Sequence, residues 1–252
     1  MEQLVAEKRL TVTYVFLAIC GAVASITTGI AWGHWKQTLD QCVGRNCSCI
    51  LYGTHTPSKF LGGSNGYCIW TTFGPLFYIF FSLCLVCFHG YRVLFATTKT
   101  SRATRSLVAK LEPGDNVRIQ AVSVETTSPL PKAFWVTTSI LSAFFTIYSV
   151  VHFAMFVSGY YRTCNQYRQS LERMLGIGGS AMPVIHSRLG CQGVFDFMDY
   201  VQQDSAWSSR GGFIYTGLDL ILGMVASAFS WILYLNATFL NIKLARLSGE
   251  EV

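Results

Sequence analysis

The stretch Phe213–Leu240, FIYTGLDLILGMVASAFSWILYLNATFL, decides the fold class of this chain. Its only charged residue is Asp219. A helix crosses a hydrocarbon core of about 30 Å with about 20 apolar residues, and this run exceeds that length. Because lipid offers the backbone no hydrogen-bond partners, we expect the stretch to form a transmembrane α-helix.

Three further apolar runs precede this one, so the sequence predicts an all-α membrane protein built as a four-transmembrane-helix bundle. With 51% hydrophobic and only 13% charged residues, the chain is too apolar for an ordinary soluble domain of 252 residues. A cleaved signal peptide ending near Ala22-Val23-Ala24 is the alternative reading of the first run, and three spans remain if it applies.

The predicted order along the chain follows from these runs. It comprises a cytosolic N-terminal tail at 1–11, spans at 12–32, 70–95, 133–158 and 213–240, extracellular loops at 33–69 and 159–212, a cytosolic loop at 96–132 and a cytosolic C-terminal tail at 241–252.

The orientation rests on the distribution of positive charge. Eleven of the 19 Lys and Arg residues lie in the two tails and in the middle loop with its flanking Arg92, against eight in the two longer remaining loops. Short cytosolic segments carry an excess of Lys and Arg, so both termini are expected in the cytosol.

The cysteines give the same orientation. Three of the nine, Cys20, Cys84 and Cys87, fall in spans, and six fall in the two loops expected outside. Disulfides persist in oxidising compartments, and an even number of cysteines confined to one side is what they leave. We expect three disulfides, and we prefer the pair Cys164–Cys191 within the second loop. The first loop then holds Cys42, Cys47, Cys49 and Cys68, whose pairing stays open.

The first loop also contains residues that could form a zinc site or an N-glycosylation site. A zinc site is disfavoured, because Cys42-x4-Cys47-x-Cys49 lacks the two-residue spacing of zinc ribbons, and no metal is expected. Asn46-Cys47-Ser48 is an N-glycosylation sequon on the side expected outside, and it predicts a glycan on Asn46.

Two ionisable residues lie at the same depth in the predicted spans. Asp219 and His152 are each six residues from the outer end of their run, which places them roughly 9 Å below the boundary. Such residues are costly in lipid and face a partner or a wet cavity. We expect an intramembrane polar pair, which either stabilises the bundle through a hydrogen bond or serves a proton or cation pathway.

Small residues recur in the first and last spans, and such faces let membrane helices approach closely. They serve either packing of the bundle or recognition of a partner within the membrane. They are Gly21, Ala22, Ala24, Ser25 and Gly29 in the first span, and Gly217, Gly223, Ala226, Ser227 and Ala228 in the fourth.

Short motifs in both cysteine-bearing loops resemble those of the transmembrane protein 179 family. They are Cys49-Ile50-Leu51-Tyr52, Cys68 directly before the second span, Arg92-Val93-Leu94-Phe95 at its exit, Cys164 answered by Cys191, and the patch Phe195, Asp196, Phe197, Asp199, Tyr200. Cys42, Cys47 and a longer middle loop depart from that pattern. The resemblance implies four spans and no reaction.

These features predict a non-enzymatic protein without cofactor. The chain has no phosphate-binding loop, zinc-protease motif or nucleophile elbow, and its basic residues form no stripe for nucleic acid. We expect an auxiliary or organising subunit that contacts lipid and binds another integral membrane protein through its extracellular loops and helix faces. The plasma membrane is the favoured location, and an internal secretory compartment is the alternative. The alternative is a small oligomeric channel or transporter that uses Asp219 and His152.

Overall fold

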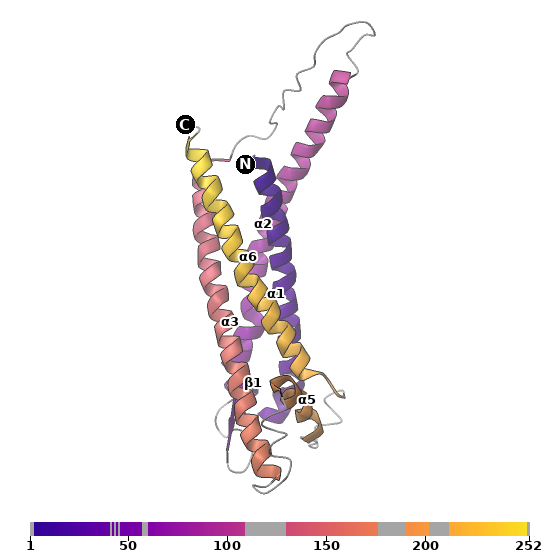
Figure 1. Cartoon of the computed structure of the whole chain (residues 1–252), viewed down its shortest axis with the longest axis vertical. Coiled ribbons are helices and arrows are strands. Elements are labelled where there is room, and N and C mark those ends of the chain that lie inside the picture. The colour runs from indigo at the N-terminus through magenta and orange to yellow at the C-terminus, as the bar shows by residue number, and fades with distance from the viewer. Residues whose placement is uncertain are drawn as a thin grey trace.

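Four long helices form the molecule, in a computed structural model that describes residues 3–40, 42, 44, 46–56, 60–108, 130–175, 190–201 and 212–250. These helices are α1 (Gln3–Leu39), α2 (Asn65–Val108), α3 (Lys132–Leu175) and α6 (Thr216–Glu250). Figure 1 shows the start of α1 and the end of α6 at one end of the bundle, which we name the terminal end. The opposite end, where the loop cysteines lie, is named the cysteine end.

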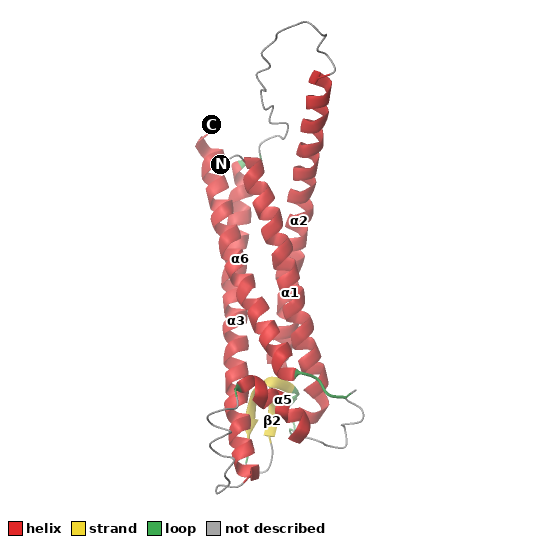
Figure 2. Cartoon of the chain, turned by 45° about the vertical axis from the view of Figure 1, so that its right-hand side comes forward, coloured by secondary structure: helices red, strands yellow, loops and turns green. Residues whose placement is uncertain are grey.

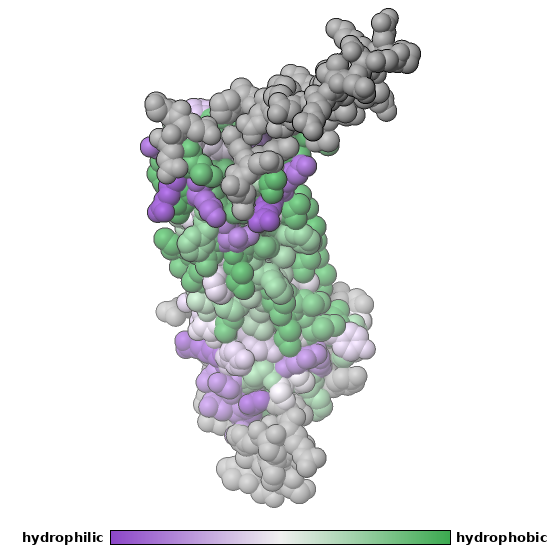
Figure 3. Space-filling view, turned by 45° about the horizontal axis from the view of Figure 1, so that its top comes forward, coloured by the Kyte–Doolittle hydropathy of each residue, from purple (hydrophilic) through white to green (hydrophobic). Residues whose placement is uncertain are grey.

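All four helices are long and apolar enough to cross a membrane. Figure 3 shows a wide apolar band across the middle of the face in view, bordered by hydrophilic residues. Large apolar side chains of the four long helices, such as Phe80, Ile147 and Phe239, are exposed, as lipid-facing residues are. The chain is therefore an all-α multi-pass membrane protein with four spans, as predicted. The candidate spans are Val5–Leu39, Asn65–Leu94, Lys132–Glu172 and Thr216–Ser248.

The helices pack as neighbours in the order α2, α1, α6, α3 (Figures 1 and 2). Aromatic side chains make the contacts between α2 and α3. Phe81 stacks on Phe145 with ring centroids 4.7 Å apart, and the rings of Trp70 and Tyr148 lie 5.0 Å apart. Side chains of this size keep the two backbones separated, and their rings line a groove of about 610 Å³ between the two helices.

The small residues of α1 and α6 face other helices of the bundle. A Cβ placed on Gly21 would lie 2.8 Å from the ring of Tyr78, and one on Gly223 would lie 3.0 Å from Thr27. Gly29 likewise contacts Thr72 of α2. Of the two roles considered for these faces, close packing within the bundle is the one that these contacts serve.

Helices α2 and α3 extend well past the spans predicted from hydropathy. α2 continues to Val108 and α3 to Leu175, so the loops predicted at 96–132 and 159–212 begin as helix. Hydropathy marks where a helix leaves lipid, whereas the helix itself ends where the backbone is interrupted. Gly159, directly after the third predicted span, lies inside α3, and Gly176 follows the end of that helix in the sequence.

The first cysteine loop, predicted only as an extracellular loop at 33–69, contains a β-hairpin. Strand β1 (Cys49–His55) pairs antiparallel with β2 (Phe60–Gly63). Gly62 and Gly63 lie in β2, where a Cβ would collide with backbone carbonyls of the segment around β1. These glycines permit close approach of two backbones, a role that turn-forming composition does not reveal.

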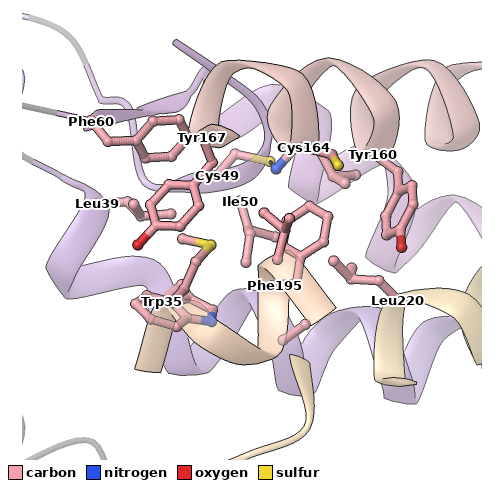
Figure 4. Close-up of a cluster of buried hydrophobic side chains, with 14 of the residues drawn as sticks. Trp35, Leu39, Cys49, Ile50, Phe60, Tyr160, Cys164, Tyr167, Phe195 and Leu220 are labelled. Carbon is pink, nitrogen blue, oxygen red and sulfur yellow. Dashed lines mark hydrogen bonds between the residues drawn. The ribbon is translucent and has the colours of Figure 1, made fainter. Parts of the chain in front are cut away.

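A short helix, α5 (Cys191–Val201), completes the cysteine end. Its residues Val194, Phe195 and Met198 are fully buried against the long helices. Figure 4 shows side chains of α1, β1, α3, α5 and α6 converging there. This core is separate from the one inside the terminal half of the bundle.

Candidate functional site: the disulfide unit

The disulfide unit consists of β1, β2, α5 and the helix ends that pack on them at the cysteine end. Its core includes Trp35, Ile50, Tyr160 and Phe195, each buried to 3% exposure or less (Figure 4). Burial of large side chains from five elements makes this end a compact domain that continues from the bundle.

Three disulfides brace the unit. Cys164–Cys191 ties α3 to the start of α5, as predicted. Cys49–Cys68 ties β1 to the start of α2, and Cys42–Cys47 closes the segment between α1 and β1. All six loop cysteines are therefore paired, and all lie at one end of the bundle. Two of these bonds therefore attach the disulfide unit covalently to α2 and α3.

The hairpin is fastened to α3 by hydrogen bonds from its own backbone. The Gly53 N–H donates to Thr163 Oγ1 at 2.9 Å, and that hydroxyl donates to the Ile50 carbonyl at 2.9 Å. The Tyr52 hydroxyl donates to the carbonyl of Met155 at 3.0 Å. Because buried backbone groups need partners, these bonds fix how the hairpin sits on the helix.

Helix α5 and the end of α1 are joined to the first turn of α6. Asp196 Oδ1 accepts a hydrogen bond of 2.8 Å from the Gly217 N–H, so the carboxylate caps α6 from a neighbouring element. The Trp35 indole donates to Thr216 Oγ1 at 2.8 Å. Gly217 packs on the backbone of Gln192, and a Cβ there would collide with it. Asp196 was predicted only as part of the patch that precedes the last span, without this capping role.

Aromatic side chains are exposed around the unit. Phe197 on α5 is 42% exposed, and Tyr161 on α3 and Tyr215 before α6 are exposed more fully. Tyrosines near a helix end suit the membrane–water boundary, where an apolar ring and a polar hydroxyl both find a partner. Phe197 has no polar group and belongs to a separate helix at the end of the molecule. Phe197 is therefore an exposed apolar side chain on the surface of the disulfide unit.

The predicted glycosylation site lies on the surface of the unit. Asn46 is exposed, whereas Ser48 of the same sequon is buried. Ser48 Oγ contacts Asn46 Oδ1 at 2.9 Å and Asn65 Oδ1 at 3.0 Å. Ser48 of the sequon thus connects the segment before β1 to the start of α2.

The predicted polar pair is wrong as a direct contact. His152 is buried, and its Nε2 donates to the Thr71 carbonyl at 3.1 Å. Pro75 stands four residues after Thr71 inside α2 and has no N–H, so it leaves that carbonyl without its helical donor. A side chain from a neighbouring helix satisfies it, as proline in a membrane helix requires. His152 therefore bonds to α2 and not to Asp219.

Asp219 lies in the first turn of α6, where an acid interacts favourably with the helix dipole. It is partly exposed and makes no hydrogen bond to His152. The two residues are equally far from the ends of their predicted spans. His152 bonds to α2, however, whereas Asp219 lies in the first turn of α6. The pathway built on their contact has no support in this arrangement.

Two polar contacts in the terminal half of the bundle were not predicted from the sequence. Glu7 is 2% exposed and holds Arg92 through two hydrogen bonds of 3.2 Å. It was placed in a polar tail, but α1 begins at Gln3 and carries Glu7 into the bundle. Deeper in, Asn241 donates to Tyr14 at 3.0 Å. An unpaired charge near lipid is costly, so Arg92 at the exit of the second span was a signal for a buried acid.

No group of three or more His, Cys, Asp and Glu side chains that could hold a metal ion occurs within the described residues. Comparison with protein-family models, with curated proteins and with solved structures finds no significant match to this chain.

Proposed function

We propose that the protein is a non-enzymatic auxiliary subunit that binds another integral membrane protein through its disulfide unit. The observation that carries this proposal is the construction of that unit. Three disulfides and a common core join a hairpin and a short helix to the ends of membrane helices. Binding surfaces held on rigid elements lose little conformational entropy when a partner docks.

Helix α5 supplies the surface that we assign to the partner. Its inner face is buried through Val194, Phe195 and Met198, while Phe197 is exposed on the outer face. Aromatic residues are enriched at the centres of protein interfaces because they bury a large apolar area with few rotatable bonds. The small residues of α1 and α6 are engaged within the bundle, so we place recognition on the disulfide unit rather than on those helix faces.

The proposal places the disulfide unit outside the cell and both termini in the cytosol, at the plasma membrane. The pairing of all six loop cysteines at one end supports an oxidising environment there. The same topology exposes Asn46 to glycosylation enzymes, and we propose that it carries a glycan. Self-association of the chain is the second arrangement that the experiment below separates from partner binding.

The disulfide pattern also supports the proposed relation to the transmembrane protein 179 family. Cys42 and Cys47, the two cysteines outside the family pattern, bond to each other. The four that follow the pattern then form the bonds to α2 and to α5. An added local disulfide therefore leaves the shared framework intact.

Site-specific photo-crosslinking in intact cells tests the function. A photoreactive amino acid replaces Phe197, and in a control chain it replaces Phe229, which faces lipid from α6. We expect one discrete adduct with a different membrane protein from position 197 and none from position 229. The 197 adduct should disappear when Cys164 and Cys191 are both changed to Ser. An adduct between two copies of the chain, or no adduct, contradicts the auxiliary role.

A further inference from the structure

A groove between α3 and α6 opens toward lipid at the terminal end of the bundle. It has a volume of about 450 Å³ and is lined by apolar side chains, among them Val136 and Ile140 of α3 and Ile242 and Ala245 of α6. Both isoleucines are among the exposed large hydrophobic residues. The groove is separate from the disulfide unit and plays no part in the function proposed above.

Two basic side chains lie at the mouth of this groove, which is its end nearest the terminal end of the bundle. Lys132 is the first residue of α3, and Arg246 lies in the last turns of α6. Both are exposed, and neither pairs with an acid among the described residues. The dipoles of α3 and α6 oppose each other at this point, because the N-terminus of α3 lies beside the last turns of α6, so the positive charge comes from the two side chains. The mouth is therefore positive while the floor is apolar.

The length of the groove matches one leaflet of a membrane. Along α3 it extends from Lys132 to Ala143, which corresponds to roughly 17 Å of helix. Half of a hydrocarbon core of about 30 Å is about 15 Å. A helix of a partner that crosses the membrane would need an apolar face of twice this length. A lipid chain, which ends at the middle of the bilayer, needs this length and a charged headgroup above it.

We infer that the groove binds an anionic phospholipid of the leaflet at the terminal end. Its acyl chain lies between α3 and α6, and its phosphate and anionic headgroup contact Lys132 and Arg246. Anionic lipids concentrate in the cytosolic leaflet, and basic pockets between membrane helices on that side bind their headgroups. The long side chains of both residues can reach upward to the headgroup layer while their stems cover the groove.

Native mass spectrometry of the full-length protein, released from nanodiscs that contain equal amounts of phosphatidylserine and phosphatidylcholine with identical chains, tests the inference. We expect the wild type to retain phosphatidylserine preferentially. Each of Lys132→Ala and Arg246→Ala should weaken that retention ~5-fold, and the double variant ~25-fold. Lys243→Ala is the matched control. It also removes one cation from α6, but Lys243 does not line the groove. It should change retention less than 2-fold.

A second variant separates the apolar floor from the charges. Ala143→Phe fills the inner part of the groove, leaves both cations in place, and should also reduce retention of phosphatidylserine. Each variant is first checked for wild-type thermal stability in detergent. Equal retention of the two lipids by the wild type overturns the inference, and so does a Lys243→Ala loss as large as that of the double variant. Crosslinks from Ile140 to a second protein chain also overturn it, because the groove then holds a helix.

Discussion

The disulfide unit and the terminal half of the bundle stabilise buried groups in two different ways. In the disulfide unit, covalent bonds and a shared apolar core hold elements that lie far apart in sequence. In the terminal half, side-chain hydrogen bonds such as Asn241 to Tyr14 and the ion pair Glu7–Arg92 join the helices. The hydrophobic effect drives the first kind of packing in water, but lipid removes most of that force between helices. Polar contacts and close packing therefore take its place.

The largest effect is expected for the Glu7–Arg92 ion pair, which tests whether polar contacts stabilise the terminal half. Changing Glu7 to Ala leaves a mostly buried guanidinium without its acid, and we expect a loss of about 4 kcal/mol in the free energy of unfolding. Denaturant unfolding in detergent, followed by tryptophan fluorescence, measures it. Lys8→Gln, at an exposed neighbouring position, should stay within about 0.5 kcal/mol. A full-sized loss in Lys8→Gln, or none in Glu7→Ala, would show that the pair does not hold the terminal end.

The disulfides should differ among themselves according to the loops that they close. Cys164–Cys191 spans 27 residues and Cys42–Cys47 spans five. Chain-entropy arguments give about 3.5 kcal/mol for the longer loop and about 2 kcal/mol for the shorter one. Paired Ser substitutions of each bond, compared by the same unfolding experiment, should follow that order. Equal losses would mean that local packing rather than loop closure sets the contribution.

The link between His152 and Pro75 is open to a double-mutant cycle. His152→Ala leaves the Thr71 carbonyl without a donor, and we expect a cost of about 2 kcal/mol, including the lost packing. Pro75→Ala restores a backbone N–H that can bond the same carbonyl. The cost of His152→Ala should therefore fall by about 1 kcal/mol in the Pro75→Ala background. Additive effects would show that the histidine serves some other group.

Removal of the glycan site should have the smallest effect on stability. Asn46→Gln is expected to change the free energy of unfolding by less than about 0.5 kcal/mol, because the side chain is exposed. It should nevertheless abolish the shift in electrophoretic mobility that an N-glycosidase produces in the wild type. Asn65→Gln is the control, since it lengthens the neighbouring amide side chain by one methylene and leaves the sequon in place. A wild-type band that does not shift with the enzyme would refute the glycan.

Hydropathy was enough to predict the four spans, and cysteine counting was enough to predict the bond Cys164–Cys191. Both signals are local or compositional. The hairpin was not predicted, because the role of Gly62 and Gly63 in letting two backbones approach closely depends on strand pairing that residue composition does not reveal. The burial of Glu7 was missed because charge near a chain terminus is usually solvated. The partner of His152 could have been inferred, since Pro75 leaves the Thr71 carbonyl without a donor.

Cysteine labelling at the two ends tests the central claim most directly. Phe197→Cys places a thiol on the disulfide unit, and Leu247→Cys places one on the exposed surface of α6 at the terminal end. A membrane-impermeant maleimide applied to intact cells should label position 197, and it should label position 247 only after permeabilisation. Labelling of position 247 in intact cells, with position 197 protected, would invert the topology and remove the disulfide unit as an extracellular binding surface.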